Sequence, residues 1–84
     1  MSTPSVTLYT SPGCADCAAV RRWLEEHDVP YSERDVTQPG VADEAKRRYG
    51  VRIAPITVVD ASTFFYGTAD QQIPHLRRAL ASAT

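Results

Sequence analysis

Residues 8–17, LYTSPGCADC, contain the pattern that decides the fold. The β-rich run at residues 6–10 predicts a short strand, and the turn-forming residues 11–13 end it. Cys14 and Cys17 then stand at the expected start of a helix, three positions apart. Ligands bind open α/β sheets at the carboxyl ends of their strands, where this strand leads into its helix. The pattern therefore predicts a functional site at the two cysteines.

The chain after Cys14 changes to helical periodicity. One face of the predicted helix collects these side chains: Cys17, Val20, Leu24 and His27. Trp23 falls off this stripe, so we expect it to pack only in part. The turn signals at residues 28–30 end the helix.

The next two elements follow from charge and turn chemistry. Residues 31–36 predict a second strand, and the consecutive charges within it favour the edge of a sheet, where charge protects against pairing with other chains. A second helix is expected to open at residues 37–40, with Pro39 in its first turn. Gly50 stands where a left-handed cap would close that helix.

Two further strands are predicted at residues 56–59 and 63–66, and the tight turn between them indicates an antiparallel hairpin. The order is therefore β-α-β-α-β-β-α, an α/β fold with a four-stranded mixed sheet and three helices. A right-handed crossover makes the first two strands parallel neighbours. The first strand is apolar and uncharged, so we expect it in the centre of the sheet.

The last helix has two possible starts. Thr68 and Gln71 could form a capping box. Pro74 would then interrupt the hydrogen-bond ladder, so a start at Asp70 or later, with Asp70 as the cap, fits equally well.

The composition is that of one globular domain, which we assign to residues 1–84. Hydrophobic residues make up 43% and charged residues 23%, which argues against a disordered chain. Apolar runs are too short to cross a bilayer, and we find no pattern of a secretory signal. The net charge of −1 gives no basic field for nucleic acid. We therefore expect a cytoplasmic monomer that binds neither nucleic acid nor membranes.

The two cysteines favour chemistry over a structural role, because a disulfide stabilises chiefly by closing a long loop and this pair closes a very short one. A helix N-terminus stabilises a thiolate, which favours an exposed Cys14 as the nucleophile. Cys17, one turn later and facing inward, would resolve the mixed disulfide. Asp16 repels the thiolate, which predicts a reduction potential nearer about −270 mV, as in thioredoxin, than about −180 mV, as in protein disulfide isomerase.

The stretch at residues 8–17 resembles the opening of glutaredoxins and of the glutaredoxin-like NrdH-redoxins and mycoredoxins. Residues 52–55, Arg-Ile-Ala-Pro, stand where that family has Arg-Thr-Val-Pro, the loop with a cis-proline. Residues 67–70 stand where it has a glycine and a residue that caps the last helix. The resemblance implies a thioredoxin fold and a dithiol oxidoreductase without bound metal or cofactor, whose redox disulfide joins Cys14 and Cys17. It also implies a set of substrate-binding residues: Ala54, Pro55, Thr68 and Asp70.

Three features tied to glutathione differ from the usual glutaredoxin pattern. Residues 15–16 are Ala-Asp in place of Pro-Tyr, Ser11 replaces a lysine, and residues 53–54 are Ile-Ala in place of Thr-Val. Glutathione, mycothiol and thioredoxin reductase therefore all stay open as electron donors. The expected partners are disulfide-containing proteins, with thioredoxin reductase and ribonucleotide reductase as candidates from the NrdH resemblance. We interpret the basic residues 46–48 as a solvated helix face, and one of them, or Arg52, is a candidate contact for an anionic reductant.

A second class of function uses the same cysteines for binding, either as a metal or iron–sulfur carrier or as a redox-sensing module. Copper chaperones also carry Cys-x-x-Cys after a first strand, but their fold ends in a strand, whereas this chain is predicted to end in a helix. A zinc site would need two further ligands. His27 and His75 are expected to lie far apart, so we predict no metal site.

Overall fold

The computed structural model describes residues 4–51 and 53–81, and its elements follow the predicted order. The strands and helices of these residues are β1 (Val6–Thr10), α1 (Ala15–Glu26), β2 (Ser32–Asp35), α2 (Val41–Tyr49), β3 (Ile56–Val59), β4 (Thr63–Tyr66) and α3 (Ala69–Ala81). The predicted α/β class with a four-stranded mixed sheet is confirmed. None of the helices in these two ranges is long and apolar enough to cross a membrane.

The sheet has the strand order β2-β1-β3-β4, which confirms β1 as an interior strand. β1 runs parallel to β2 and antiparallel to β3, and β3 and β4 form the predicted antiparallel hairpin. β2 lies at one edge, with Glu33 and Arg34 exposed, as its charges predicted. An interior strand is covered on both faces, so an unpaired charge in β1 would be costly.

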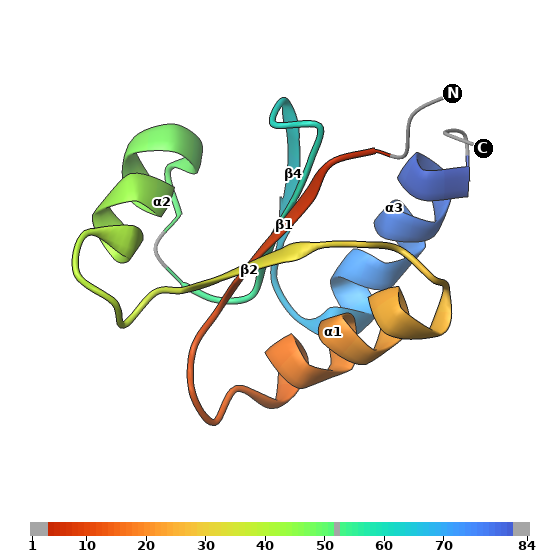
Figure 1. Ribbon diagram of the computed structural model, residues 1–84, viewed down its shortest axis with the longest axis horizontal. Helices are drawn as coiled ribbons and strands as arrows, with labels where there is room; N and C mark the ends of the chain where they lie inside the picture. The colour runs from red at the N-terminus through yellow and green to blue at the C-terminus, as the bar shows by residue number, and fades with distance from the viewer. Residues whose placement is uncertain (1–3, 52, 82–84) are drawn as a thin grey trace.

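Two separate cores hold β1 in place. Figure 1 shows α2 on one side of the sheet and α1 with α3 on the other. Successive side chains of a strand point to opposite faces. Leu8 accordingly packs with Leu24 and Leu76 in the core of α1 and α3, whereas Tyr9 packs with Val41 toward α2. Each fully buried leucine contributes about 2 kcal/mol, so the end of β1, where the dithiol segment begins, is firmly anchored.

Trp23 belongs to the core, so the expectation of partial packing is wrong. Its side chain is 8% exposed and lies in the same cluster as Val20 and Leu24. The reason is that α1 contacts both the sheet and α3, so its buried face is wider than a single stripe. His27, predicted on that stripe, is instead exposed at the C-cap, where its ring stacks on Trp23 with centroids 4.2 Å apart.

α2 begins at Val41, later than predicted, and Pro39 lies in the turn before it. Gly40, at the N-cap, has a φ of 81°, and a residue in this left-handed conformation cannot be part of an α-helix. The predicted left-handed cap at the other end is confirmed, because Gly50 has a φ of 74° and donates its N–H to the last turn of α2.

Tyr9 connects β1 to α2 and makes the stability of the fold depend on pH. Its hydroxyl donates to Oε2 of Glu44 at 2.6 Å, and burial together with this carboxylate raises the pKa of Tyr9 to about 12. The pKa of a tyrosine in an unfolded chain is about 10, so the folded protein holds the hydroxyl proton of Tyr9 more tightly than the unfolded chain does. The contribution of the protonated Tyr9 to the stability of the fold is therefore complete below about pH 10 and is lost as the pH rises toward about 12.

We expect the free energy of unfolding to fall over this alkaline range, and Tyr9→Phe to reduce the fall by about 2 kcal/mol. Urea unfolding of both proteins at a series of pH values measures the difference. Tyr31, whose pKa is also raised to about 12, titrates in both proteins and cancels from the comparison. An equal fall in the two proteins would contradict the role given to Tyr9.

Candidate active site

Cys14 is the N-cap of α1. Its Sγ accepts a hydrogen bond from the backbone N–H of Cys17 at 3.0 Å, so a sulfur takes the place of the oxygen that usually caps a helix. Its backbone is extended, and Gly13 before it has a φ of 75°, a conformation that favours glycine. The Cys14 side chain is partly exposed. The sulfur therefore lies at the positive end of α1 and within reach of solvent.

Cys17 lies one turn into α1 and is shielded, with 1% of its surface exposed. A disulfide joins it to Cys14, and the two Cα atoms are 5.2 Å apart. Residues three positions apart on a helix lie on the same face, so the local backbone brings the two sulfurs together. One cysteine is open to a partner molecule and the other is covered.

The loop before β3 contains a cis-proline, as the family resemblance implies, since the Ala54–Pro55 peptide bond is cis. Pro55 is buried and Ala54 is partly exposed. β1 pairs Tyr9 with Ile56 in antiparallel register, so this loop lies at the same edge of the sheet as the segment that leads from β1 into Cys14. Arg52, a candidate contact for an anionic reductant, falls outside the described residues.

α3 begins at Ala69, and Thr68 caps it, so the alternative start with Asp70 as the cap is wrong. The Thr68 N–H donates to Oε1 of Gln71 at 2.9 Å, and Oγ1 of Thr68 accepts from the Gln71 N–H at 3.2 Å. This reciprocal capping box satisfies two N–H groups at the helix start. Pro74 lies inside the helix, where its missing N–H removes only the bond to the carbonyl of Asp70. Asp70 itself is exposed in the first turn, where a negative charge favours the helix.

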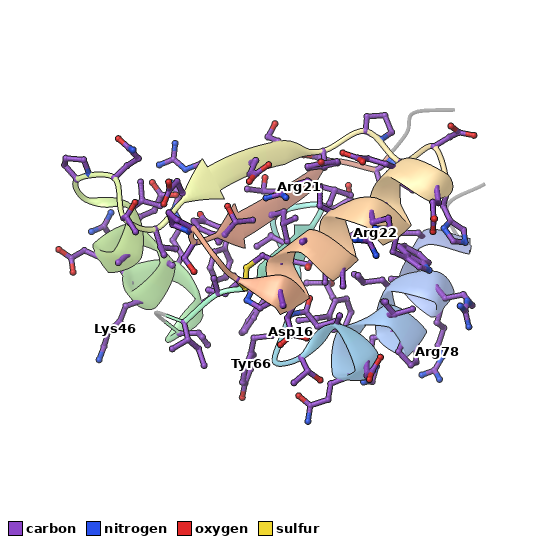
Figure 2. The ribbon with its side chains drawn as sticks, turned by 90° about the horizontal axis from the view of Figure 1, so that it is seen from below. Asp16, Arg21, Arg22, Lys46, Tyr66 and Arg78 are labelled. Carbon is purple, nitrogen blue, oxygen red and sulfur yellow. A yellow bond between two sulfur atoms is a disulfide. The ribbon has the colours of Figure 1, made fainter. Side chains whose placement is uncertain are left out.

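Asp16 joins the starts of α1 and α3. Its Oδ1 accepts a hydrogen bond from the N–H of Ala69 at 3.1 Å. Figure 2 shows Asp16 on the first turn of α1, facing the beginning of α3. The N–H of a first helical residue has no partner within its own helix, so this carboxylate satisfies a group that would otherwise be unpaired. The sequence indicated only a charge near Cys14, whereas the fold also uses that charge to tie two helix ends together.

Asp16→Asn separates the charge from the contact, because an asparagine oxygen can still accept from Ala69. Removing a negative charge near Cys14 stabilises the thiolate of the reduced protein. We therefore expect the pKa of the reduced Cys14 thiol to fall and the reduction potential to rise, the potential by up to about 30 mV. Thiolate absorbance as a function of pH, and equilibration with glutathione redox buffers, measure the two quantities.

Glu26→Gln is the matched control for this prediction, because it removes the same charge at the opposite end of α1, where the side chain is exposed. Glu26→Gln should leave the pKa of the Cys14 thiol and the reduction potential unchanged. Equal shifts in the two variants, or no shift in Asp16→Asn, would contradict the electrostatic role of Asp16.

Two large apolar side chains are exposed on the segments just described. Ile53 is 66% exposed and precedes Ala54, and Tyr66 is 56% exposed at the end of β4. Figure 2 shows Tyr66 projecting outward on the side of the molecule where Asp16 lies. Each of them adjoins, in sequence, a segment near the site: Ile53 precedes Ala54, and Tyr66 precedes Gly67.

The basic residues of α2 are exposed, as the sequence predicted for a solvated helix face. Lys46 and Arg47 are exposed on the helix. Arg48 lines a cavity of about 320 Å³ that it shares with Ser5 and Ala61. Those two residues lie beyond the amino end of β1, whereas the other end of this strand leads to the cysteines. A role for one of these basic residues in holding an anionic reductant stays a prediction.

The family assignment follows from a comparison of the whole sequence with family models. The Glutaredoxin model matches residues 6–63, which include the dithiol segment and the cis-proline loop. The chain belongs to the glutaredoxin family. Its thioredoxin fold and redox disulfide agree with this membership.

Solved structures similar to this glutaredoxin-family protein cover nearly its whole length. The thioredoxin-like protein BC3987 is 29% identical, with a TM-score of 0.76 over 89% of this chain and 99% of that one. The NrdH-redoxin of Escherichia coli is 26% identical, with a TM-score of 0.69 over 86% of this chain and 93% of that one. A buckwheat glutaredoxin in complex with glutathione is 13% identical, with a TM-score of 0.73 over 95% of this chain and 74% of that one, so it shares the fold alone.

Curated relatives of this glutaredoxin-family protein include a different kind of molecule. The global transcriptional regulator Spx of Listeria innocua is 57% identical over 42 residues, which are 49% of this chain. The match spans only 32% of that regulator, so most of its length has no counterpart in the aligned segment.

Sequence reasoning missed Gln72, a fully buried glutamine on α3 with three hydrogen-bond partners. Glutamines on helices are usually exposed, so the residue type of Gln72 did not predict its burial. Its position did carry a signal, because Gln72 lies one turn before Leu76 and two turns before Leu80 on the apolar face of the helix.

Proposed function

We propose that the chain is a thiol–disulfide oxidoreductase that reduces protein or mixed disulfides in a reducing cytoplasm. The observation that carries this proposal is the arrangement of sulfurs at the start of α1. Cys14 is accessible and its sulfur accepts the N–H of Cys17, which itself is shielded. A thiolate at Cys14 would be stabilised by that N–H and by the positive end of α1.

The reaction proceeds by two exchanges between thiolates and disulfides. In the reduced protein the Cys14 thiolate attacks one sulfur of the substrate, which forms a mixed disulfide and releases the other sulfur as a thiolate that takes up a proton. The Cys17 thiolate then attacks Sγ of Cys14 and releases the second substrate thiol. The substrate gains two electrons, and the protein keeps the Cys14–Cys17 disulfide until a donor reduces it.

The segments around the dithiol suit an extended substrate. The Ala54–Pro55 loop lies at the sheet edge where Cys14 begins its helix, and we assign both residues to substrate orientation. Thr68 and Asp70, at the start of α3, are the second part of the proposed binding surface, because the Asp16 contact brings that helix end to the start of α1.

Thioredoxin reductase is the electron donor that we favour over glutathione and mycothiol, and no bound cofactor is required. Ser11 occupies the position where glutaredoxins usually carry a lysine that helps to hold glutathione. The NrdH-redoxin of E. coli, 26% identical over nearly the whole chain, is described as having a thioredoxin-like activity profile. Disulfide-containing proteins, with ribonucleotide reductase among the candidates, are the proposed substrates.

Reducing the oxidised protein with each donor in parallel tests this assignment. We expect thioredoxin reductase with NADPH to support repeated turnover on a protein disulfide, and glutathione and mycothiol to support it poorly. Turnover with none of the three donors, when the chemically reduced protein also fails to reduce a protein disulfide, would contradict the proposed function itself.

A second candidate function is redox sensing without turnover. It is favoured by the 57% identity over 42 residues to Spx, a protein named as a transcriptional regulator and not as an enzyme. A sensor would oxidise and reduce its dithiol but release substrate slowly, so it would give one turnover where an enzyme gives many.

The metal-carrier role is the other alternative for the two cysteines. Among the described residues, no three His, Cys, Asp or Glu side chains form a group that could hold a metal ion. Absorption spectra with metal analysis, in air and without oxygen, test the carrier role, which predicts a chromophore that Cys14→Ser removes.

A further inference from the structure

Gln72 is a polar residue in an apolar layer. Its side chain is fully buried, on the face of α3 that also carries Leu76 and packs against the sheet. Burying an amide is costly unless its donors and acceptor find partners. The proposed exchange reaction does not use its chemistry, so its burial needs another explanation.

Both ends of the Gln72 amide are hydrogen-bonded. Oε1 accepts from the hydroxyl of Thr57 at 2.6 Å, and Nε2 donates to the carbonyl of Pro55 at 2.9 Å and to the carbonyl of Gly67 at 3.0 Å. Backbone carbonyls can only accept hydrogen bonds, so the amino group must face them. The orientation of the amide is therefore defined by its surroundings.

The two carbonyls belong to opposite strands at one end of the β3–β4 hairpin. The last pair in register is Ile56 with Tyr66, so Pro55 and Gly67 are the next pair outward. Proline has no N–H, and this pair cannot form the mutual hydrogen bonds of an antiparallel ladder. Gln72 supplies two donors in their place, one for the carbonyl on each side.

Both segments continue directly into the proposed substrate-binding residues. Pro55 follows Ala54, and Gly67 precedes Thr68. Gly67 has a φ of 111°, and a Cβ at this position would collide with the side chain of Gln71. Glycine restricts its own backbone less than any other residue, so the distance of the Gly67 turn from the Pro55 loop depends on what lies between them.

We propose that Gln72 is a positioning residue that holds the Pro55 and Gly67 segments at a fixed separation. An extended disulfide substrate then meets the backbone of Ala54 and the sulfur of Cys14 in one geometry. The inference rests on the proposed function. Gln72 itself does not touch substrate, so its removal affects an extended substrate and spares a small one.

The experiment compares two oxidants against the full chain, reduced beforehand and mixed by stopped flow. One is a peptide with a single internal disulfide, which can lie along both segments, and the other is hydroxyethyl disulfide, which has no peptide backbone. Gln72→Met removes both N–H donors and keeps a side chain of similar length. We expect the second-order rate constant for the peptide to fall about tenfold, and that for hydroxyethyl disulfide to change less than about twofold.

Thr57→Val is the matched control. It removes the third hydrogen bond of the same buried amide but leaves both bonds to the carbonyls, so it should lower stability without changing the ratio of the two rate constants. Gln72→Leu is a second variant without hydrogen-bond donors, and it should show the same selective loss as Gln72→Met. In the unaltered protein, the Nε2 protons of Gln72 should exchange slowly with solvent by NMR, a measurement that needs no variant.

The inference is overturned if Gln72→Met slows both oxidants equally or neither, if Thr57→Val produces the same selective loss, or if the Nε2 protons exchange freely. If Gln72→Met does not fold, Gln72→Leu and the exchange measurement decide. A natural-sequence protein that reduces neither oxidant would overturn the proposed function and this inference together, whereas an active one with unselective variants would overturn the inference alone.

Discussion

Cys14→Ser should lower disulfide reduction to the uncatalysed rate. The serine hydroxyl can still cap α1 by accepting the N–H of Cys17, so the helix start should persist. An alcohol is not deprotonated near neutral pH and cannot exchange with a disulfide, so the first step of the reaction is lost. The measurement is NADPH-coupled turnover on a protein disulfide, with circular dichroism to show that the variant folds.

Cys17→Ser should behave differently from Cys14→Ser, and the difference between the two variants tests the roles of the two cysteines. Cys14 can still attack in this variant, but nothing resolves the mixed disulfide from within the protein. The covalent adduct should therefore accumulate and be visible as an added mass, and reduction of small thiol adducts can continue if an external thiol resolves them. Equal loss of activity in both variants, without a trapped adduct in Cys17→Ser, would contradict the assignment of Cys14 as nucleophile and Cys17 as resolving thiol.

Leu24→Ala should produce a large loss of stability and spare the dithiol. Leu24 is fully buried where α1 meets the sheet and α3. Truncating a buried leucine removes its transfer free energy and leaves a cavity, which together cost about 2 to 5 kcal/mol. The free energy of unfolding of a small domain is only about 5 to 15 kcal/mol, so this loss is a large share of the total.

Ile53→Ala is the control for that prediction, because it removes a side chain of the same size that is 66% exposed. Its unfolding free energy should change by less than about 0.5 kcal/mol. Urea unfolding of the oxidised proteins compares the two variants with the natural sequence. A similar loss in both variants would mean that burial in the α1 core does not govern stability.

Much of the fold could be predicted because its signals are local. The uncharged β1, the charged β2 and the glycine cap of α2 each depend on side chains within a few positions of one another. Errors arose where a second element decided the outcome. Trp23 lies off the helical stripe that the sequence indicates, yet it is buried in the core that α1 shares with α3. α2 begins after Pro39, later than predicted, because Gly40 takes a left-handed conformation.

The candidate site divides in the same way. Spacing and turn residues within residues 8–17 determine that two sulfurs meet at a helix start, with one covered and one accessible. Only the tertiary structure decides that Asp16 bonds to Ala69, 53 positions later, and that Gln72 joins Pro55 to Gly67. Helical spacing depends only on residues that are close together in the sequence, so it can be recognised in a single segment of the chain. A hydrogen bond between distant segments exists only after the cores have packed, because packing brings donor and acceptor together and removes the water that would otherwise satisfy them.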